Sequence, residues 1–179
     1  MIADKDRSGW FGASDVSMIM GNWGTKTFDN WWLVKLGLRV DSFESEAMNA
    51  GTHWEHRVLD HLQVPNKDRQ ILLPELKLRV NLDGDDGHRI TEVKTHRADK
   101  PYRLPKAHRQ QVLVQMMATG MEGRIAAYAL EPEDYRNYLR DVDYGRLTLH
   151  SVAYDGTFIA QFRERCKFLA DCLERGAHP

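Results

Sequence analysis

The sequence predicts an α/β layered domain with a mixed central β-sheet. Amphipathic stretches at helical spacing occupy both ends of the chain, β-branched alternating stretches occupy its middle, and one more helical stretch separates the later strands. Helices before, between and after strands are typical of a sheet covered by helices. We expect a single domain over residues 1–179, with N-terminal helices (1–65), a central sheet and helix (70–131), and a C-terminal strand and helix (146–175).

Composition and charge narrow the class of protein. Of the 179 residues, 42% are hydrophobic and 28% charged, which is ordinary for a globular protein with a substantial core. The formal net charge is −1, so binding to nucleic acid would have to come from local basic patches. We expect no membrane association, because no apolar run is long enough, and no secretory leader. Cys166 and Cys172 are too few for a disulfide framework, so we expect reduced, partly buried thiols in a cytosol.

Three helices are predicted before the first strand. Ser14 and Asp15 are N-cap candidates for a short helix ending at Gly21, and "FDNWWLVKLGL" follows with apolar residues at helical spacing. A longer helix is expected from about Ser45 to Gln63, with Pro65 marking its end. Its apolar side is formed by Trp54, Val58, Leu59 and Leu62.

The next segments predict strands and two further helices. "QILLPELKLRVNLDG" and "HRITEVKTH" alternate and are separated by a turn rich in Asp and Gly. A helix is expected from about Pro105 to Gly120, then strands at "GRIAAYALE" and "LTLHSVAYD", then a helix from about Gly156 to Arg175. The apolar stripe of that last helix consists of Phe158, Phe162, Cys166, Leu169 and Leu173.

The hairpin between residues 81 and 96 gathers charged side chains. If Asp86 and Gly87 form a two-residue turn, residue 85 faces 88, residue 83 faces 90 and residue 81 faces 92. Asp83, Glu92 and Lys94 then project from one sheet face, with the two carboxylates as diagonal neighbours within reach of one ion. Paired carboxylates favour a compensating cation, and Mg²⁺ or Mn²⁺ prefers oxygen ligands.

Lys94 would lie beside such an ion. Its ammonium group can orient an attacking water, neutralise charge on a phosphate, or release a proton if its pKa is depressed. This chemistry is typical of metal-assisted phosphodiester hydrolysis. The alternative is a solvated hairpin with Lys–Glu pairs, which these residues alone favour because Asp-x₈-Glu-x-Lys occurs often by chance. An EF-hand is excluded, because Gly87 stands where an oxygen ligand belongs.

Two helices carry further polar candidates. Glu55 lies among apolar neighbours in "GTHWEHRVLD" and would supply a third carboxylate, while Gln111 and Gln115 share one face of a helix. Each is ordinary alone, but the order helix-Glu, strand-Asp, strand-Glu-x-Lys, helix-Gln is hard to obtain by accident. His53 and His56 flank Glu55, yet we reject a zinc site, because the ligand set is oxygen-rich and these histidines point to different helix faces.

That order resembles the PD-(D/E)XK nuclease superfamily, and more closely the YqaJ-type viral recombinase group of lambda-exonuclease-like nucleases. The resemblance covers roughly residues 7 to 120. It rests on "RSGWFGASDVSMIMG", "AGTHWEHRVLD", "NLDGDDG", "ITEVKTH" and "QVLVQMMATG", all in order. It implies a restriction-endonuclease-like core, a mixed central sheet flanked by helices.

The resemblance also implies roles for individual residues. Metal ligands would be Glu55, Asp83, Glu92 and the carbonyl of Val93, and Lys94 would be the catalytic lysine. Gln111 and Gln115 would be the family's helix glutamines beside the active site. Arg7 and Ser14, seven residues apart, resemble the pair that grips a 5′-phosphate. Asn81 stands where the family has a serine near that phosphate, and Leu82 and Leu113 replace a proline and a glutamine of the pattern.

A basic segment follows the second strand of the hairpin. It would track phosphates beside the site, or it is simply a solvated loop. Its members are Arg97, Lys100, Arg103, Lys106, His108 and Arg109, interrupted by Tyr102. We take Arg103 and Arg109 as candidates for substrate binding.

The function implied is a Mg²⁺-dependent DNA exonuclease of the phage recombination type, with Mn²⁺ able to substitute. It would degrade one strand from the 5′ ends of double-stranded DNA and leave a 3′ overhang for a single-strand-annealing protein. A homotrimer, and a phage or prophage gene product in the bacterial cytosol, are also implied by the resemblance. The alternatives are an endonuclease on the same core and a non-catalytic protein that binds DNA ends on a nuclease scaffold, which would need no Mg²⁺.

Overall fold

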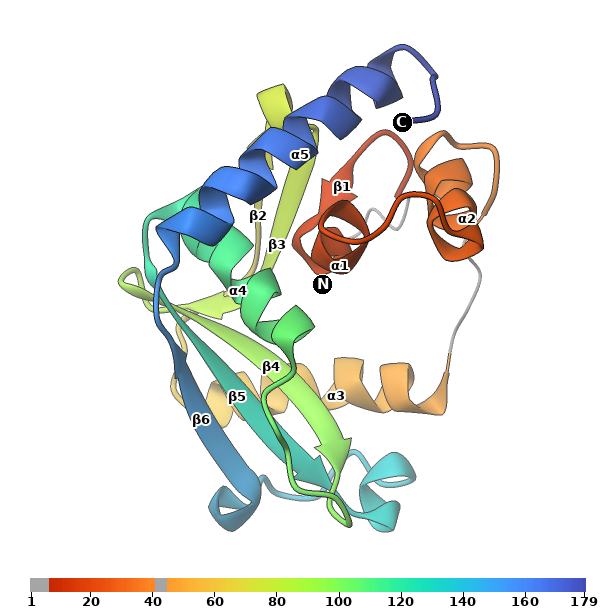
Figure 1. Cartoon of the computed structure of the whole chain (residues 1–179). Coiled ribbons are helices and arrows are strands. Elements are labelled where there is room, and N and C mark those ends of the chain that lie inside the picture. The colour runs from red at the N-terminus through yellow and green to blue at the C-terminus, as the bar shows by residue number, and fades with distance from the viewer. Residues whose placement is uncertain (1–6, 41–44) are drawn as a thin grey trace.

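The computed structural model describes residues 7–40 and 45–179, so residues 1–6 and 41–44 of the predicted domain lie outside the described residues. Six described strands form one mixed sheet in the order β1-β3-β4-β5-β6, with β2 paired to β3 (Figure 1). The strands are β1 (Phe11–Gly12), β2 (Asn66–Leu73), β3 (Leu78–Asp85), β4 (Arg89–Arg97), β5 (Glu122–Leu130) and β6 (Leu147–Val152). β4 and β5 run parallel, whereas β5 and β6 run antiparallel. The predicted mixed sheet is confirmed.

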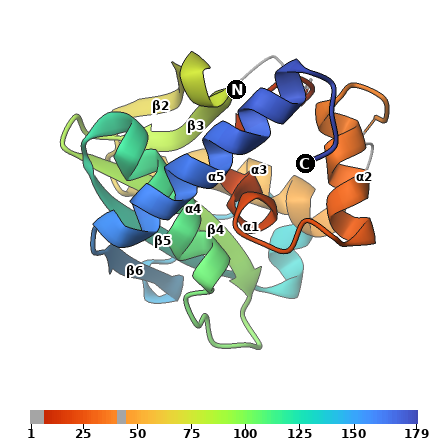
Figure 2. The same cartoon turned by 45° about the horizontal axis from the view of Figure 1, so that its top comes forward.

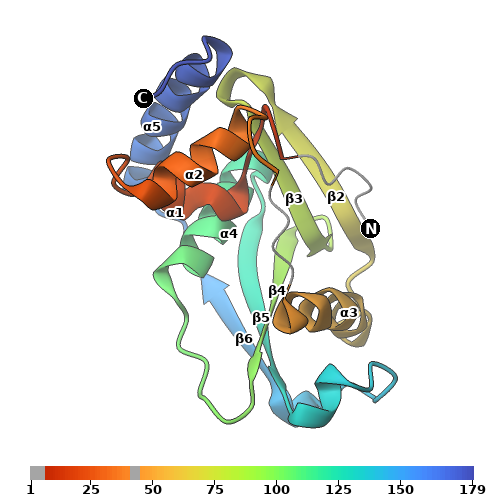
Figure 3. The same ribbon diagram turned by 90° about the vertical axis from the view of Figure 1, so that its right-hand side faces the viewer.

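Helices cover both sides of this sheet. They are α1 (Val16–Ile19), α2 (Lys26–Lys35), α3 (Glu46–His61), α4 (Lys106–Thr119) and α5 (Gly156–Glu174). Figure 3 shows α3 on one side of β4 and β5 and α4 on the other, and Figure 2 shows α5 crossing α4. No helix in the described part of the chain has both the length and the apolar character needed to cross a membrane.

Two hydrophobic clusters follow from this layering. The larger one joins α1, α2, α4 and α5 to β3, and the smaller one joins α3 to β4 and β5 through Trp54, Val58 and Val93. The predicted apolar side of α3 is confirmed, since Trp54, Val58 and Leu59 are all buried. Ser45 caps α3, because its side chain accepts a hydrogen bond from the Met48 N–H at 3.2 Å.

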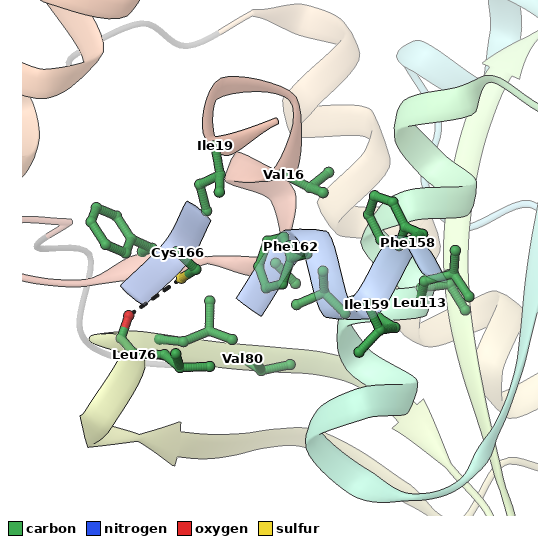
Figure 4. Packing of buried hydrophobic residues seen from close by; sticks show 14 of the residues in the cluster. Val16, Ile19, Leu76, Val80, Leu113, Phe158, Ile159, Phe162 and Cys166 are labelled. Carbon is green, nitrogen blue, oxygen red and sulfur yellow. Dashed lines mark hydrogen bonds between the residues drawn. The ribbon is translucent and has the colours of Figure 1, made fainter. Parts of the chain in front are cut away.

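The C-terminal helix is held over the sheet by its apolar stripe. Phe158, Phe162 and Cys166 are buried between α4, α1 and β3 (Figure 4). The Cys166 thiol donates a hydrogen bond to the Leu76 carbonyl at 3.4 Å, and burial raises the pKa of this thiol to about 12. Both cysteines are free and buried. The expectation of reduced thiols agrees with this structure.

The N-terminal expectations need two corrections. The helix expected at residues 14–21 is a 3₁₀ turn, η1 (Ala13–Asp15), followed by the short α1. Asp15 is the N-cap residue of α1 as predicted, but its side chain makes no capping hydrogen bond to α1. It accepts hydrogen bonds from the Gly12 N–H at 2.7 Å and the Trp31 indole at 3.0 Å, and pairs with buried Lys35 at 2.6 Å. This ion pair fixes η1 against α2.

The stretch expected as one strand at residues 70–84 is a hairpin. Pro74 begins a 3₁₀ turn, η2 (Pro74–Leu76), and Lys77 has φ +48°, so the chain reverses there. β2 then pairs antiparallel with β3, from Leu73 opposite Leu78 to Asn66 opposite Asp85. The alternating pattern therefore corresponds to two strands, β2 and β3, rather than to one.

Candidate active site

β3 and β4 separate after a short stretch of pairing. Gly84 lies opposite Thr91 and Asp85 opposite Ile90, and no further pair joins these two strands. The predicted register is wrong by two residues. Three residues, 86–88, separate the two strands, and the Asp86 N–H donates to the Arg89 carbonyl at 3.1 Å, so the chain reverses one residue later than predicted. The same register carried onward sets Asp83 directly opposite Glu92 instead of diagonal to it, at the point where the strands part.

This separation leaves backbone groups of β4 without a strand partner on the β3 side. The Val93 N–H instead donates to the Asp83 carboxylate at 2.8 Å. The N–H and C=O of one residue in an extended strand point to the same edge, so the Val93 carbonyl also faces the opening. The Val93 side chain is buried against α3, which fixes the backbone here.

Glu92 is held by three side chains. The Lys94 ammonium donates to its Oε1 at 2.8 Å, the Gln111 amide donates to the same oxygen at 2.6 Å, and the Gln115 amide donates to Oε2 at 2.6 Å. Gln111 Oε1 also accepts from Lys94 at 3.1 Å. The two helix glutamines of α4 thus orient the Glu-x-Lys pair of β4, and the structure brings these four predicted residues together.

Lys94 is held as a cation. Its burial opposes the charge, but the neighbouring Glu92 and Asp83 carboxylates outweigh burial and raise the pKa of Lys94 above its ordinary value. The sequence left open a lysine that releases its proton through a depressed pKa. The pKa of Lys94 is raised in the metal-free site, which favours the roles of orienting a water and neutralising a phosphate.

In Asp83 and Glu55 the surroundings disfavour the charged form, whereas in Lys94 they favour it. Burial first, and then repulsion from Glu92, raise the pKa of Asp83 well above its ordinary value. The same two causes raise the pKa of Glu55 to about 7. Glu55 reaches the opening from α3, next to buried Trp54. Three carboxylates therefore act on one another here, and Lys94 supplies a positive charge among them.

Such an arrangement fits a hard divalent cation. The donors that face the opening, carboxylates from α3, β3 and β4 with the Val93 carbonyl, are all oxygens, as Mg²⁺ and Mn²⁺ prefer. The raised pKa values of Asp83 and Glu55 report negative charge that a cation would compensate. The predicted ligand set therefore has the donor chemistry of a metal site, and its three carboxylates lie near enough to act on one another's charge.

The candidates for phosphate binding lie towards the N-terminal side of the site. Asn81 is two residues before Asp83, and its carbonyl accepts from Gln115 at 3.1 Å. Ser14 is exposed on η1, which contacts both α4 and β3, and β1 pairs with β3 at Gly12 and Arg79. Arg7 is exposed and begins the described chain. Asn81 thus lies on the strand that bears Asp83, and Ser14 lies on the neighbouring η1 turn, whereas the charge of Arg7 acts on Lys35 of α2.

The basic segment is only partly joined to the site. Arg103 is exposed on the loop before α4, and Arg109 pairs with Asp155 at 3.4 Å, at the start of α5. Tyr102 turns inward, where its hydroxyl shares a hydrogen bond with His108 Nδ1 at 2.8 Å. Burial raises the pKa of Tyr102 to about 12, and Lys94 and Glu92 also act on it. Tyr102 and His108 therefore adjoin the Glu-x-Lys pair more directly than the two arginines.

Asp68 is a polar neighbour of the site that the sequence did not indicate. It lies on β2 between the pairs Lys67–Gly84 and Arg69–Leu82, and thus opposite Asp83. Its imidazole partner is His56 of α3, at 3.0 Å. No local pattern indicates this contact, because it depends on the β2–β3 hairpin. The sequence predicted a single strand there.

Comparison with solved structures identifies the fold. An alkaline exonuclease from Laribacter hongkongensis superposes with a TM-score of 0.68 and 18% identity, over 95% of this chain and 90% of that chain. A phage-related exonuclease from Haemophilus somnus superposes with a TM-score of 0.66 and 12% identity, over 93% and 94% of the two chains. The chain has the lambda-exonuclease-like PD-(D/E)XK fold.

The lambda-exonuclease-like fold covers nearly the whole chain, including α5 and β6 beyond the motifs of the resemblance. The Laribacter enzyme is also solved in complex with dAMP, and that structure superposes with a TM-score of 0.69 and 19% identity, over 95% and 90% of the two chains. No family model matches this sequence, and no curated protein matches it. The similarity is therefore one of fold rather than of sequence.

Proposed function

We propose that this protein is a Mg²⁺-dependent DNA exonuclease that hydrolyses phosphodiester bonds from the 5′ ends of double-stranded DNA. The observation that carries the proposal is the group of Glu55, Asp83, Glu92 and Lys94 at the opening between β3 and β4. Because these residues lie near one another in an exonuclease fold, we favour a catalytic site. The alternative, a solvated hairpin with Lys–Glu pairs, was favoured when the hairpin sequence was considered alone. All four groups needed for hydrolysis are present, which disfavours a non-catalytic scaffold.

The chain's own residues would perform distinct tasks. Glu55, Asp83, Glu92 and the Val93 carbonyl would hold a divalent cation, Mg²⁺ with Mn²⁺ as substitute. When bound, that cation would neutralise charge on the scissile phosphate and make water a better nucleophile. Lys94, kept protonated by Glu92, would orient the attacking water and stabilise charge that develops on the phosphate. Gln111 and Gln115 would keep Glu92 in place.

The end of the DNA would be held beside this centre. We propose that Arg7, Ser14 and Asn81 bind the 5′-terminal phosphate, because Asn81 lies two residues before Asp83 on β3 and Ser14 lies on η1, which contacts β3. Arg103 and Arg109 would contact the phosphates of the strand that continues past the site. A 3′ overhang would remain for a single-strand-annealing protein, in a bacterial cell carrying a phage or prophage, with the chain acting as one nuclease domain in a trimer.

The deciding experiment is a cleavage time course with purified protein and Mg²⁺. The substrates are linear duplexes labelled at either end, with and without a 5′-phosphate, and covalently closed circular DNA. Loss from 5′-phosphorylated ends with the circle intact supports the proposal, and Arg7→Ala should then remove the preference for the phosphate. Cutting of the circle would instead make the protein an endonuclease. Binding without cleavage in Mg²⁺ or Mn²⁺ would leave a non-catalytic DNA-end-binding protein.

A further inference from the structure

A second group of metal-binding side chains adjoins the proposed catalytic centre. Within residues 7–40 and 45–179, the group of three His, Cys, Asp or Glu residues whose donor atoms all lie within 4.8 Å of one another is Glu55, His56 and Asp68. His56 Nε2 lies 3.0 Å from Asp68 Oδ2. Glu55 is thus gathered with a histidine and an aspartate on one side, while its charge is felt by Asp83 and Glu92 on the other.

Regular elements hold this group in place. Glu55 and His56 are consecutive residues of α3, and Asp68 comes from β2, opposite Asp83 of β3. Gly84 of β3 lies so close to α3 that a Cβ there would meet Leu59 at 2.9 Å. The tight packing of α3 on the β2–β3 hairpin therefore fixes the distance between the two halves of the group. All three side chains are half-buried, so an ion can reach them from solvent.

The donors differ in kind from those of the catalytic centre. That centre offers oxygens only, whereas this group offers one imidazole nitrogen and two carboxylates. Mg²⁺ seldom takes an imidazole, while Zn²⁺ binds nitrogen strongly and is commonly held by three protein ligands with one open position. Tetrahedral ligands at about 2.1 Å from Zn²⁺ lie roughly 3.4 Å apart, so small side-chain rotations would close the group on an ion.

The zinc site rejected from the sequence required both His53 and His56. In the structure His53 stacks on Tyr138 with ring centroids 4.1 Å apart, so it is directed away from this group. His56 alone joins Glu55, and the third donor is Asp68, from a strand that the sequence did not predict. The group in the structure thus contains one histidine, His56, whereas the zinc site considered from the sequence contained two.

We propose that Glu55, His56 and Asp68 form a Zn²⁺ site whose occupancy withdraws Glu55 from the catalytic centre and so inhibits cleavage. A Glu55 carboxylate engaged by Zn²⁺ between His56 and Asp68 has less charge to offer the Mg²⁺ site. The binding of Zn²⁺ stands on the geometry of the three residues alone. Its effect on cleavage rests on the proposed function.

Zn²⁺ binding is tested first on the whole, metal-free chain by calorimetric titration with ZnCl₂, in the presence of excess Mg²⁺. One Zn²⁺ per chain is expected to bind and to resist displacement by Mg²⁺. His56→Ala and Asp68→Asn should each weaken binding by roughly 10–100-fold or more, since even the loss of supporting groups around a metal has effects of that size. His53→Ala is the matched control, because it removes a histidine of the same helix that faces Tyr138.

Equal Zn²⁺ binding by wild type and His56→Ala, or no binding by wild type, would overturn the site. Thermal unfolding without zinc confirms that each variant is folded. Cleavage in Mg²⁺ is then measured against added Zn²⁺, where wild type should be inhibited and His56→Ala should keep its basal rate and resist inhibition. Zinc that binds through His56 without slowing cleavage would overturn the inhibitory role. A wild type inactive in Mg²⁺ would contradict the proposed function, while the titration would still decide the site.

Discussion

Glu92 shares its two carboxylate oxygens among the Lys94 ammonium and the amides of Gln111 and Gln115. These charge-assisted hydrogen bonds are short and directional, so Glu92 has one orientation before any ligand arrives. Lys94 is in turn fixed by Glu92 and Gln111. The residues proposed to bind the cation and to act on the water are therefore positioned by one network.

Replacement of Lys94 tests the proposed centre most directly. Lys94→Ala removes the ammonium group that contacts Glu92, and we expect cleavage in Mg²⁺ to fall by roughly 10²–10⁴-fold, the usual contribution of one group that acts on the reacting water. DNA binding, measured by fluorescence anisotropy, should change little. Lys167→Ala is the control, since it removes an exposed lysine of α5. Normal cleavage by Lys94→Ala would show that the active site has been assigned to the wrong residues.

Glu55 gives the stability of the metal-free protein a particular pH dependence. Burial and the Glu92 charge raise the pKa of Glu55 to about 7, whereas in the unfolded chain a glutamate titrates near ~4.3. Between these values the folded protein binds more protons than the unfolded chain, so the free energy of unfolding falls as pH rises. Thermal unfolding with a chelator should show a lower Tm at about pH 8 than at about pH 5.

The Glu55→Gln variant provides the contrast, because glutamine cannot ionise. Its Tm should fall less over the same pH range, while Glu164→Gln on the exposed face of α5 should follow wild type. Identical slopes for wild type and Glu55→Gln would mean that Glu55 ionises normally in the folded protein.

At the scale of elements, the parting of β3 and β4 makes the site. Had the two strands paired along their whole length, the Val93 N–H would bond to β3 rather than to Asp83. Close packing of α4 on β5 and of α3 on β3 holds the strands in this arrangement, and two glycines permit it. A Cβ at Gly123 would clash with Val112 Cγ1 and lie 2.9 Å from Met116 Cγ, both on α4.

Substitution of Gly123 should therefore weaken the α4–β5 contact. Gly123→Ala forces atoms into a filled interface, and we expect a loss of about 1–3 kcal/mol in the free energy of unfolding, measured with urea. Gly156→Ala is the control, since its nearest neighbour, Tyr154 Cε1, would be 3.7 Å away. An unchanged urea midpoint for Gly123→Ala would mean that α4 shifts freely on β5.

Sequence patterns predicted the regular elements well where one periodicity dominates. The helices at α3, α4 and α5, the strands at β4, β5 and β6, and the mixed sheet were all expected from spacing alone. The β2–β3 hairpin was not, because Leu72, Leu76 and Leu78 keep one alternating phase across the 3₁₀ turn at Pro74. The register of β3 on β4 was also missed, since "DDGH" allows the turn at Gly87 and His88 as well as at Asp86 and Gly87.

The residues of the candidate site also divide into those that the sequence predicted and those that it did not. The order of Glu55, Asp83, Glu92, Lys94 and the two glutamines could be read from motifs, and the structure brings them together. The contacts of Asp68 with His56 and of Asp15 with Lys35 could not, because they join distant segments whose side chains have no local periodicity. Prediction failed where a contact depends on tertiary packing rather than on spacing along one element.

Across the whole molecule, α5 ties the two ends of the chain together. Arg165 donates to the carbonyls of Ile19 and Gly21, each at 2.7 Å, and its guanidinium lies 4.1 Å from the Trp23 ring centroid. Trp23 stacks in parallel on Phe168, one turn further along α5. The segment that bears Ser14 is thereby anchored to the C-terminal helix.

Removal of this anchor should act on the fold and on the handling of DNA ends. Arg165→Ala loses two hydrogen bonds from a charged group and a cation–π contact, and we expect a loss of about 2 kcal/mol in urea unfolding. If Ser14 holds a terminal phosphate, preference for 5′-phosphorylated ends should weaken too. Arg163→Ala on the exposed side of α5 is the control. Equal stability of the two variants would show that the Arg165 contacts are not formed in solution.

The hydrogen bond from the buried Cys166 thiol to Leu76 has a practical consequence for spectroscopy. Both native cysteines are enclosed, and a thiol whose pKa is raised to about 12 has almost no thiolate at neutral pH to react with a maleimide or a spin label. An exposed position changed to cysteine, such as Ser17 near η1 or Ala98 beyond β4, would therefore carry the label alone. Paired labels at these two positions would report, without deletion of any native cysteine, how far the walls of the opening move when DNA enters.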